Sequence, residues 1–408
     1  MSEERYTVIS ADTHAGANHE TYREYLDSAY HQEFDDWRGG YKNPWKDLRD
    51  TDLRIRNWDD DRRDQDMLAD GCVGEVVFPN TVPPFYPGFV LFAGPPTAEE
   101  YPRRRAGIQA HNRWLKDFCD AKPGQRAGVG QIFLNDIDDA IEDALWLKEN
   151  GVRGGVLLPN ISPDIKHVRP LYDPEYDRLW AVLEANEIPV TVHGGTGSPD
   201  YGKFPASKAL QIAEVSFYGT RPFVQLLMAA VFERFPKLKF VMTENAAGGM
   251  PKLIADLDRI VMAIRSGAMG ELKYREEDKL AKSASEYFAQ NCYIGASMPG
   301  PMDMKVGDIL PDDRLMWGND YPHDEGSGPF SRESLRLALD GMDTARRKQV
   351  LSENAAKLYD FDLDYLSTLA ADHGPTVAEL AEPLTELPAK PNMALMNGAR
   401  QAGLKILA

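Results

Sequence analysis

The feature that most constrains this chain is a regular alternation of short apolar runs with longer amphipathic stretches along most of its length. Several runs, such as VGEVVFP and GGVLLP, are apolar throughout, which is typical of strands covered on both faces of a parallel sheet. Eight strands alternating with helices predict an α/β chain folded as a closed (β/α)₈ (TIM) barrel. An open doubly wound sheet is the alternative, but no GxGxxG follows the first run and the chain supplies more units than that fold needs. The expected strands are Thr7–Ala11, Val73–Phe78, Ala127–Ile132, Gly154–Leu158, Pro189–Val192, Lys239–Thr243, Cys292–Gly295 and Leu315–Trp317.

Helix boundary signals lie between these runs. Asp136 is a predicted N-cap for the stretch IDDAIEDALWLKEN, which Gly151 ends. Asp173 followed by Pro174 predicts a second helix start, and residues 207–234 predict a longer helical stretch.

Two regions exceed a minimal barrel. Residues 15–60 follow the first strand and are rich in Tyr and Trp, so we expect a cap insertion over the barrel mouth. Residues 363–408 are rich in proline, and we expect a C-terminal arm that wraps a neighbouring subunit in a homodimer or higher homo-oligomer. The predicted organisation is therefore a barrel domain over 1–362, which includes the cap, and an arm over 363–408.

The charge and the cysteines exclude some classes of protein. A formal net charge of −18 disfavours binding to nucleic acid or to an anionic membrane, because both need clustered Lys and Arg. The three cysteines form no CxxC, and so sparse a set is typical of a reducing compartment. The sequence MSEERY has no signal-peptide pattern. We therefore predict a cytoplasmic protein with a small-molecule substrate.

Residues of metal-ligand type follow four of the predicted strands. Asp12 and His14 end the first strand, and their spacing places both side chains on the same side. His193 ends the fifth strand, Glu244 the sixth and Asp320 the eighth. Each residue taken singly is as well explained by a structural role, such as capping a turn. Together they deliver two imidazoles and three carboxylates to the rim at which barrel active sites are built.

Such a concentration of ionisable groups requires a counter-charge. Carboxylates and imidazoles that converge in a barrel mouth repel or desolvate each other unless a cation lies between them. The mixture of oxygen and imidazole ligands suits Zn, Mn or Fe. We therefore predict a divalent metal, either one ion or two, held among Asp12, His14, His193, Glu244 and Asp320.

Other polar residues have weaker support. His323 follows Asp320 and is a candidate catalytic residue, although a histidine that caps the turn explains it equally well. Arg221 and Asn245 are candidate substrate-binding residues, since a guanidinium can hold a carboxylate through two hydrogen bonds. Most of the arginines between residues 54 and 63 are expected to pair at the surface with neighbouring acids.

Five motifs resemble a known family. SADTH, VHGG, TENAAGG, WGNDYPH and LSENAAKLYDFD occur in the order found in the amidohydrolase-related family, the second amidohydrolase group, which includes aminocarboxymuconate-semialdehyde and resorcylate decarboxylases. The resemblance covers roughly residues 5–362. It implies a (β/α)₈ barrel with a divalent metal at its mouth, with ligands at Asp12, His14, His193 and Asp320.

The chain departs from the family in two places. Many decarboxylating members have His-x-His or Glu-x-His where this chain has Asp12 and His14. They also tend to have histidine at the end of the sixth strand, where this chain has Glu244. The first departure makes the site richer in carboxylate, and the second removes the usual imidazole acid.

Three functions are compatible with these residues. The first is a metal-dependent hydrolase or lyase that acts on a small organic acid, amide or ring-cleavage product, with Asp320 as ligand and general base and Glu244 as second ligand or proton shuttle. The second is a dinuclear non-haem iron (Fe/Fe or Fe/Mn) monooxygenase that hydroxylates a small or CoA-linked carboxylic acid and needs an external electron donor. The third is a non-catalytic partner subunit.

Overall fold

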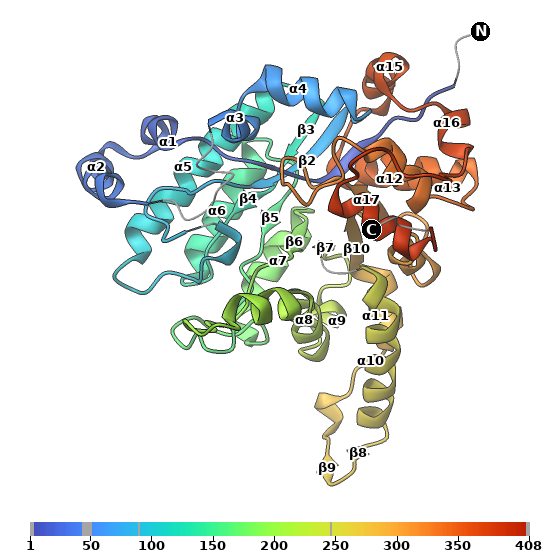
Figure 1. Cartoon of the computed structure of the whole chain (residues 1–408). Coiled ribbons are helices and arrows are strands. Elements are labelled where there is room, and N and C mark those ends of the chain that lie inside the picture. Colours follow the sequence, from blue (N-terminus) through green and yellow to red (C-terminus); the bar gives the residue numbers. More distant parts are fainter. Residues whose placement is uncertain (1–3, 43–50, 89, 245–246, 405–408) are drawn as a thin grey trace.

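The strands of a parallel barrel are all present in the computed structural model, which describes residues 4–42, 51–88, 90–244 and 247–404 (Figure 1). Each predicted strand has a counterpart, and the third is divided at Val129 into two short strands. The strands are β1 (Ile9–Ala15), β2 (Gly74–Pro79), β3 (Arg126–Gly128), β4 (Gly130–Gln131), β5 (Val156–Leu157), β6 (Val190–His193), β7 (Phe240–Thr243), β10 (Cys292–Ser297) and β11 (Leu315–Gly318).

The strands pair in parallel in chain order. One sheet has the order β1-β2-β3 and the other has the order β11-β10-β7-β6-β5-β4. The two sheets meet at Val129, whose N–H donates to the Val77 carbonyl at 2.8 Å. At the other end, the Asp320 N–H donates to the Asp12 carbonyl at 2.9 Å, and Thr13 forms a parallel bridge with Tyr321. First and last strands are therefore neighbours, as a barrel requires.

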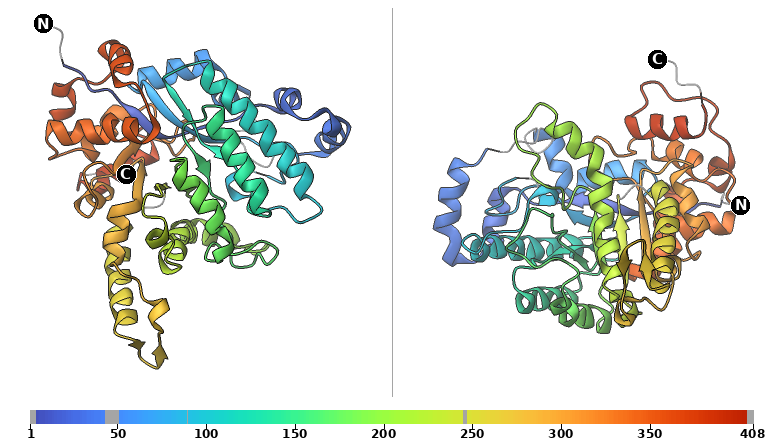
Figure 2. Two further views of the ribbon diagram at one scale, coloured as in Figure 1. Left: turned by 180° about the vertical axis from the view of Figure 1, so that it is seen from behind. Right: turned by 90° about the horizontal axis from the view of Figure 1, so that it is seen from below.

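Helices follow the strands and cover the outer face of the barrel. Seen from behind, the helices within residues 101–185 lie over the strands (Figure 2). The principal helices are α4 (Asp60–Ala69), α5 (Tyr101–Asp120), α6 (Ile137–Glu149), α7 (Asp177–Ala185), α8 (Ser207–Met228), α9 (Val231–Arg234), α10 (Met250–Arg265), α11 (Ala284–Asn291), α12 (Ser331–Ala338), α13 (Thr344–Lys348) and α14 (Asn354–Tyr359).

The predicted helix signals agree with this arrangement. The Asp136 side chain caps α6 by accepting from the N–H groups of Asp138 and Asp139, and Gly151, with φ at +73°, follows the helix. Asp173 accepts from the Glu175 N–H and begins a short 3₁₀ turn at Pro174 that leads into α7. The stretch 207–234 forms α8 and α9.

Two apolar layers hold the barrel together. Side chains such as Val76, Phe78, Val129 and Val241 form one buried cluster, and a second, larger cluster includes residues of the helices. Gly155 sits where β5 approaches β6, with φ at +82°. A Cβ there would lie 2.1 Å from the Pro189 carbonyl oxygen, so only glycine lets the strands approach this closely.

The expected cap region contains short helices. They are α1 (His19–Tyr25), α2 (His31–Gly40) and α3 (Thr51–Arg54). Tyr22 anchors α1 to α5 through a 2.8 Å hydrogen bond between its hydroxyl and His111 Nδ1. Phe34 and Phe85 pack edge to face, 5.9 Å between centroids. The role of this insertion as a lid over the mouth stays a prediction, and residues 43–50 lie outside the described residues.

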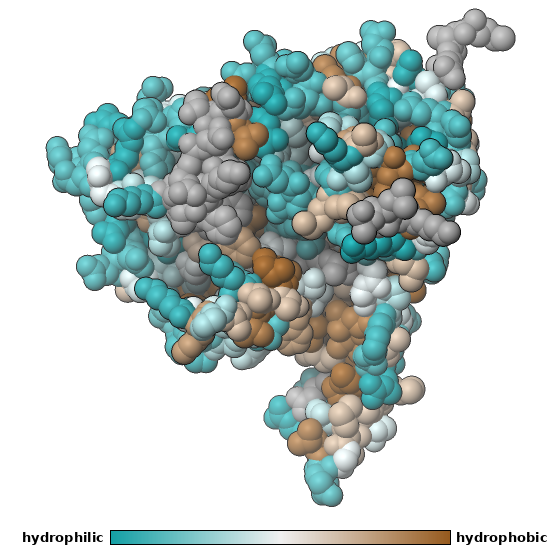
Figure 3. All heavy atoms as spheres, viewed as in Figure 1, coloured by the Kyte–Doolittle hydropathy of each residue, from teal (hydrophilic) through white to brown (hydrophobic). Residues whose placement is uncertain are grey.

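The sequence analysis did not predict a projection formed by α10 and a small hairpin. The hairpin strands β8 (Ala268–Met269) and β9 (Leu272–Lys273) follow α10 and lie at the end of the molecule farthest from the termini (Figure 1). Exposed apolar side chains gather on α8 and on this projection, where the surface is brown in Figure 3.

The tail folds back on its own chain. It forms α15 (Leu363–His373), α16 (Val377–Ala381) and α17 (Met393–Gln401). Leu395 and Ala399 of α17 pack against Leu337 of α12. The tail also pairs with the N-terminus, since the Tyr6 N–H donates to the Pro375 carbonyl at 2.9 Å. That the tail contacts a neighbouring subunit stays a prediction.

Among the described residues, every helix is too short or too polar to cross a membrane.

Candidate metal centre

The first strand brings Asp12 and His14 into the barrel mouth. β1 extends to Ala15, four residues beyond its predicted end at Ala11, because the polar DTH segment is as deeply buried as the apolar residues around it. His14 Nε2 lies 3.4 Å from Asp12 Oδ1, and both side chains are fully buried. The pairing of β1 with β2 shifts register between Ser10 and Thr13, just where the ligand segment begins.

The fifth barrel strand, β6, adds His193. Its Nε2 lies 3.3 Å from Asp12 Oδ1, and its Nδ1 lies 2.9 Å from the Gly194 carbonyl oxygen. Because a carbonyl can only accept, Nδ1 carries a hydrogen, which leaves Nε2 as the nitrogen that faces Asp12 and would bind an ion. This is the tautomer that a metal-binding histidine needs.

The last strand supplies Asp320. Its Oδ1 lies 3.2 Å from His14 Nε2 and 2.9 Å from His323 Nδ1. Asp320 has a positive φ of 60°, in the left-handed region that a non-glycine residue enters only at a cost of roughly 1–3 kcal/mol. Glu244, at the end of β7, has φ at 55°. Both acids therefore lie at sharp turns that follow their strands.

These donors fit a divalent cation. Asp12, His14 and His193 form one group whose ligand atoms lie within 4.8 Å of one another, and His14, Asp320 and His323 form a second. Within the described part of the chain, Asp320 Oδ2 and His14 Nδ1 are buried without a hydrogen-bond partner, and His14 Nε2 has only the carboxylates of Asp12 and Asp320 at ion-pair distance. Leaving such atoms unpaired is costly, and an ion between imidazole nitrogens and carboxylate oxygens would satisfy them.

Charge interactions in the cluster oppose the effect of burial on the pKa. Burial disfavours a charged His14, but Asp12 and Asp320 outweigh it and raise the pKa of His14 to about 10. Burial also opposes ionisation of Asp12, yet the charge of His193 holds the pKa of Asp12 well below its usual range. The carboxylates of Asp12 and Asp320 therefore favour a positive charge at this point of the barrel.

Glu244 lies at the edge of the cluster. Its Oε2 is 3.3 Å from His193 Nδ1, and its side chain is partly exposed. Burial is the largest cause that raises the pKa of Glu244 to about 8, and the charges of Asp320 and Asp12 add to it. Glu244 is therefore close enough to exchange a proton with the site.

Two further residues contact the ligands and were not predicted. Ser297 donates a hydrogen bond from Oγ to Asp12 Oδ2. The Phe78 ring lies 4.8 Å from the His193 ring, between centroids. Ser297 was missed because its strand was expected to end at Gly295. Its place at the end of an apolar run was the available signal.

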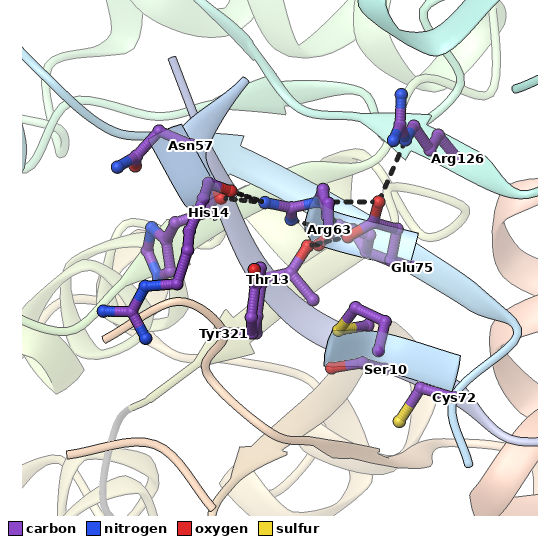
Figure 4. A network of polar contacts seen from close by, with 12 residues as sticks. Ser10, Thr13, His14, Asn57, Arg63, Cys72, Glu75, Arg126 and Tyr321 are labelled. Atoms are coloured by element: carbon purple, nitrogen blue, oxygen red, sulfur yellow. Dashed lines mark hydrogen bonds and ion pairs between the residues drawn. The ribbon is translucent and has the colours of Figure 1, made fainter. Parts of the chain in front are cut away.

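A buried network of charges supports β1 from outside (Figure 4). Arg63 Nη2 donates to Glu75 Oε2 at 2.6 Å, and Arg126 Nε donates to Glu75 Oε1 at 3.0 Å. Thr13 Oγ1 donates to Glu75 Oε2 at 2.9 Å, and Arg63 Nη1 donates to the His14 carbonyl at 2.8 Å. Arg63 is 1% exposed, so its expected surface pairing is wrong. Its carboxylate partner lies on a neighbouring strand, which local sequence does not reveal.

The remaining predicted site residues differ in outcome. His323 joins the cluster through Asp320, and its ring lies 4.1 Å from the His14 ring. The Arg221 guanidinium lies over Tyr218, 5.8 Å from the ring centroid, and no contact described for it reaches the ligand group. Asn245 lies outside the described residues.

Comparison with known proteins is consistent with this geometry. The chain matches the amidohydrolase family over residues 37–361, a range that begins after Asp12 and His14. No curated protein matches the chain.

Several solved structures share its fold. One is 5-carboxyvanillate decarboxylase from Sphingomonas paucimobilis, with a TM-score of 0.62 and 17% identity over 88% of this chain and 100% of that chain. Another is dihydroxybenzoic acid decarboxylase from Polaromonas sp. JS666 with bound manganese and 2-nitroresorcinol, with a TM-score of 0.61 and 15% identity over 87% of this chain and 97% of that chain. A third is an amidohydrolase from Mycobacterium avium subsp. paratuberculosis K-10, with a TM-score of 0.62 and 17% identity over 88% of this chain and 99% of that chain.

These comparisons favour the hydrolase or lyase reading over an iron monooxygenase or a non-catalytic subunit. The match to the family spans most of the chain, and the barrel carries the expected ligand residues at its strand ends. The chain therefore belongs to the amidohydrolase family of metal-dependent enzymes.

Proposed function

We propose that the protein is a divalent-metal lyase that decarboxylates a small planar organic acid. The observation that carries this proposal is the set of fully buried groups on Asp12, His14, His193 and Asp320, several of whose ligand atoms have no other partner in the described structure. So many ionisable groups are brought together at the cost of stability, which is typical of an active site rather than of a structural core.

The metal is proposed to be manganese. A 5-carboxyvanillate decarboxylase and a dihydroxybenzoic acid decarboxylase of the same fold both hold this ion. Zinc and iron suit the same nitrogen and oxygen ligands, so elemental analysis that measures each metal per chain must decide among the three. When bound, the cation supplies Lewis acidity that polarises a carboxylate or carbonyl oxygen of the substrate.

The residues around the cation divide the remaining work. Asp320 accepts from His323 Nδ1 at 2.9 Å, which fixes the direction of its carboxylate, and we assign it the role of metal ligand. His323 orients Asp320. Glu244 reaches both the cluster and solvent, so we assign it the transfer of a proton between them.

Decarboxylation balances with these groups alone. The bond between the ring carbon and the carboxylate carbon breaks, and carbon dioxide leaves. The electron pair stays on the ring carbon, which takes one proton, and Glu244 is the group placed to deliver it. The reaction needs no electron donor and no water. Hydrolysis of a small amide would use the same ligands and is separated from decarboxylation by its products.

An assay of metal and product tests this function. We expect close to one divalent ion per purified chain, and release of carbon dioxide from 2,6-dihydroxybenzoate or 5-carboxyvanillate. Asp320→Asn keeps the fold but removes an anionic ligand of the proposed ion, so turnover should fall at least ~100-fold. Asp372→Asn on the exposed surface of α15 is the matched control and should leave turnover unchanged.

Three outcomes would contradict the proposal. No bound metal in protein purified without chelator would remove its basis. Near-normal turnover in Asp320→Asn would show that the reaction does not depend on this carboxylate. Amide hydrolysis without release of carbon dioxide would replace the lyase by a hydrolase.

We also propose that the enzyme is a cytoplasmic homo-oligomer. In support of the compartment, Cys72, Cys119 and Cys292 are buried free thiols. In support of assembly, α8 and α10 expose large apolar side chains at Ile212, Phe217 and Met262.

A further inference from the structure

The seam between the first and last strands of the barrel differs from the other contacts between neighbouring strands. β1 and β11 belong to different sheets, so among the described residues no strand ladder joins them. On its other side, β1 pairs with β2, and that pairing shifts register between Ser10 and Thr13. Asp12 lies within the shift and has no partner in this ladder among the described residues. The position of Asp12 must therefore be fixed by contacts other than a regular strand pairing.

Two candidate metal ligands flank this seam. Asp12 lies on β1 and Asp320 follows β11, and their Oδ1 atoms lie 3.4 and 3.2 Å from His14 Nε2. The two strands approach each other closely here, since a Cβ on Gly318 would lie 2.6 Å from the Asp12 Cβ. A small change at the seam would therefore change the separation of the two carboxylates, and with it the shape of the candidate metal site.

Ser10 closes the seam through a ring of hydrogen bonds. Its Oγ lies 2.8 Å from both the Asp12 carbonyl oxygen and Asn319 Oδ1, so the hydroxyl hydrogen is shared between two acceptors. The same Oγ accepts from the Asn319 N–H at 3.0 Å. The ring is completed by the Asp320 N–H, which donates to the Asp12 carbonyl at 2.9 Å. One hydroxyl thus links the backbone of Asp12 to the segment that carries Asp320.

The Asn319 side chain is itself held in one orientation. Its Oδ1 also accepts from the Tyr321 N–H at 3.3 Å, which identifies this atom as the amide oxygen. Its Nδ2 lies 3.5 Å from Met67 Sδ and 3.8 Å from Cys72 Sγ, both weak acceptors. Ser10 and Asn319 are both 0% exposed, so neither can exchange these partners for bulk water. The pair is therefore a fixed element of the seam.

We propose that Ser10 and Asn319 are positioning residues, which set the separation of the Asp12 and Asp320 carboxylates and thereby the affinity of the site for a divalent cation. Both act through the backbone of the ligand segments, since Ser10 Oγ bonds the Asp12 carbonyl rather than its carboxylate. Removing the hydroxyl leaves buried groups of Asn319 short of a partner and frees the two strands to shift. This inference rests on the proposed function, since it assumes that a cation binds between these carboxylates.

The test measures the dissociation constant of manganese by titration calorimetry on metal-depleted protein. Ser10→Ala should raise this constant by roughly 10–100-fold, as the loss of a partner outside the ligand shell commonly does, without a change in stoichiometry. Ser10→Thr keeps the hydroxyl and should restore most of the affinity. Ser352→Ala is the matched control, because Ser352 is also buried but bonds only the Lys348 carbonyl of its own helical stretch among the described contacts. It should bind manganese as the wild-type protein does.

A second variant keeps the test decisive if Ser10→Ala fails to fold. Asn319→Ala removes the other half of the pair and should weaken manganese binding in the same way. Because the two residues act as one element, the double variant should bind manganese about as weakly as the weaker single variant.

The outcomes separate this inference from the proposed function. Wild-type affinity in Ser10→Ala and Asn319→Ala, or losses that multiply in the double variant, would overturn the positioning role and leave the metal function standing. Failure of the wild-type protein to bind manganese would overturn the proposed function itself.

Discussion

At the scale of single residues, Glu75 is a buried carboxylate whose charge must be compensated within the fold. Its carboxylate is buried between two guanidinium groups, and the network reaches the His14 carbonyl through Arg63. Replacing one member of such a network leaves the others charged and unpaired, which costs more than the network itself contributes. The support of the metal ligands thus depends on a residue that does not touch them.

The first prediction concerns this carboxylate. Glu75→Gln should lower the free energy of unfolding at neutral pH by roughly 3–5 kcal/mol, measured by urea denaturation. Glu33→Gln is the matched control, because Glu33 pairs with Arg103 at the surface and should change stability by less than about 1 kcal/mol. Similar stability of the two variants would contradict the role given to the network.

The contribution of Glu75 to the free energy of unfolding should depend on pH. Burial opposes ionisation, but the charge of Arg63 outweighs it and lowers the pKa of Glu75 from 4.5 to about 2. A carboxylate with a lowered pKa stabilises the fold above its unfolded pKa. Its contribution is therefore lost as the pH falls from about 4.5 towards 2. The wild-type protein should lose this part of its stability in that range, and Glu75→Gln should not.

How far the site follows from sequence depends on which residue is considered. Asp12, His14, His193 and Asp320 were predicted because each ends an apolar run, and parallel strands end at a common rim. Ser297 also ends an apolar run, but serine has too many ordinary uses to be recognised. Arg63 was expected at the surface because the local sequence shows only its acidic neighbours. Its actual partner, Glu75, lies on β2 and meets Arg63 only when α4 packs against that strand.

At the scale of elements, the start of α6 shows how one side chain fixes a boundary. Asp136 accepts from the N–H groups of Asp138 and Asp139 at 2.9 and 3.1 Å. These groups have no partner within the helix. The same helix packs its Ala144 and Leu147 against the barrel, so its register matters for the core.

The second prediction is therefore that Asp136→Ala destabilises the protein by about 0.5–2 kcal/mol, seen as a lower midpoint in chemical denaturation. Asp136→Asn retains a capping oxygen and should cost markedly less. If both variants lose the same stability, the charge rather than the cap is responsible.

Elements with strong local signals were predicted, and the others were not. The strands and the capped helices follow from apolar runs and from Asp and Gly at their ends. The third strand is divided at Val129. The Val129 N–H donates to the Val77 carbonyl, whereas the next N–H, of Gly130, donates to the Gly155 carbonyl. The sequence alone does not show this change of partner strand. The β8–β9 hairpin has exposed strands of two residues each, which are too short to show periodicity.

At the scale of the whole molecule, the metal should act as a link between distant parts of the barrel. Its candidate ligands come from β1, β6 and the end of β11, so a bound ion adds to global stability.

The third prediction is that manganese raises the midpoint of thermal unfolding and chelator lowers it. At a thousandfold excess over its dissociation constant, an ion that binds only the folded state adds about 4 kcal/mol. His14→Ala should make the midpoint insensitive to both additions. A midpoint in wild-type protein that does not respond to manganese would contradict a site built from these strands.

One asparagine of the tail contacts the loop that follows the candidate ligand Asp320. Asn392 Nδ2 donates to the carbonyls of Gly326, Ser327 and Gly328, at 2.8, 3.0 and 3.1 Å. This loop follows Asp320 and His323, so the tail holds the segment that carries them.

The fourth prediction is that Asn392→Ala lowers turnover several-fold and leaves metal content and secondary structure unchanged. Asn150→Ala at the end of α6 is the matched control, because its side chain bonds only its own helix among the described contacts. Unchanged turnover in Asn392→Ala would show that the loop holds its shape without the tail.

The position of these groups along the chain also sets the order in which the enzyme can be made. A ribosome makes Asp12 and His14 early, Asp320 much later, and Asn392 after Asp320. Until β11 is made, the candidate ligands on β1 and β6 lack the carboxylate of Asp320, so a nascent chain holds only part of the ligand set. The complete set of candidate ligands therefore exists only after Asp320 has been made. A messenger truncated shortly before the tail would yield chains that have the ligands but lack the bracing of the loop that bears Asp320.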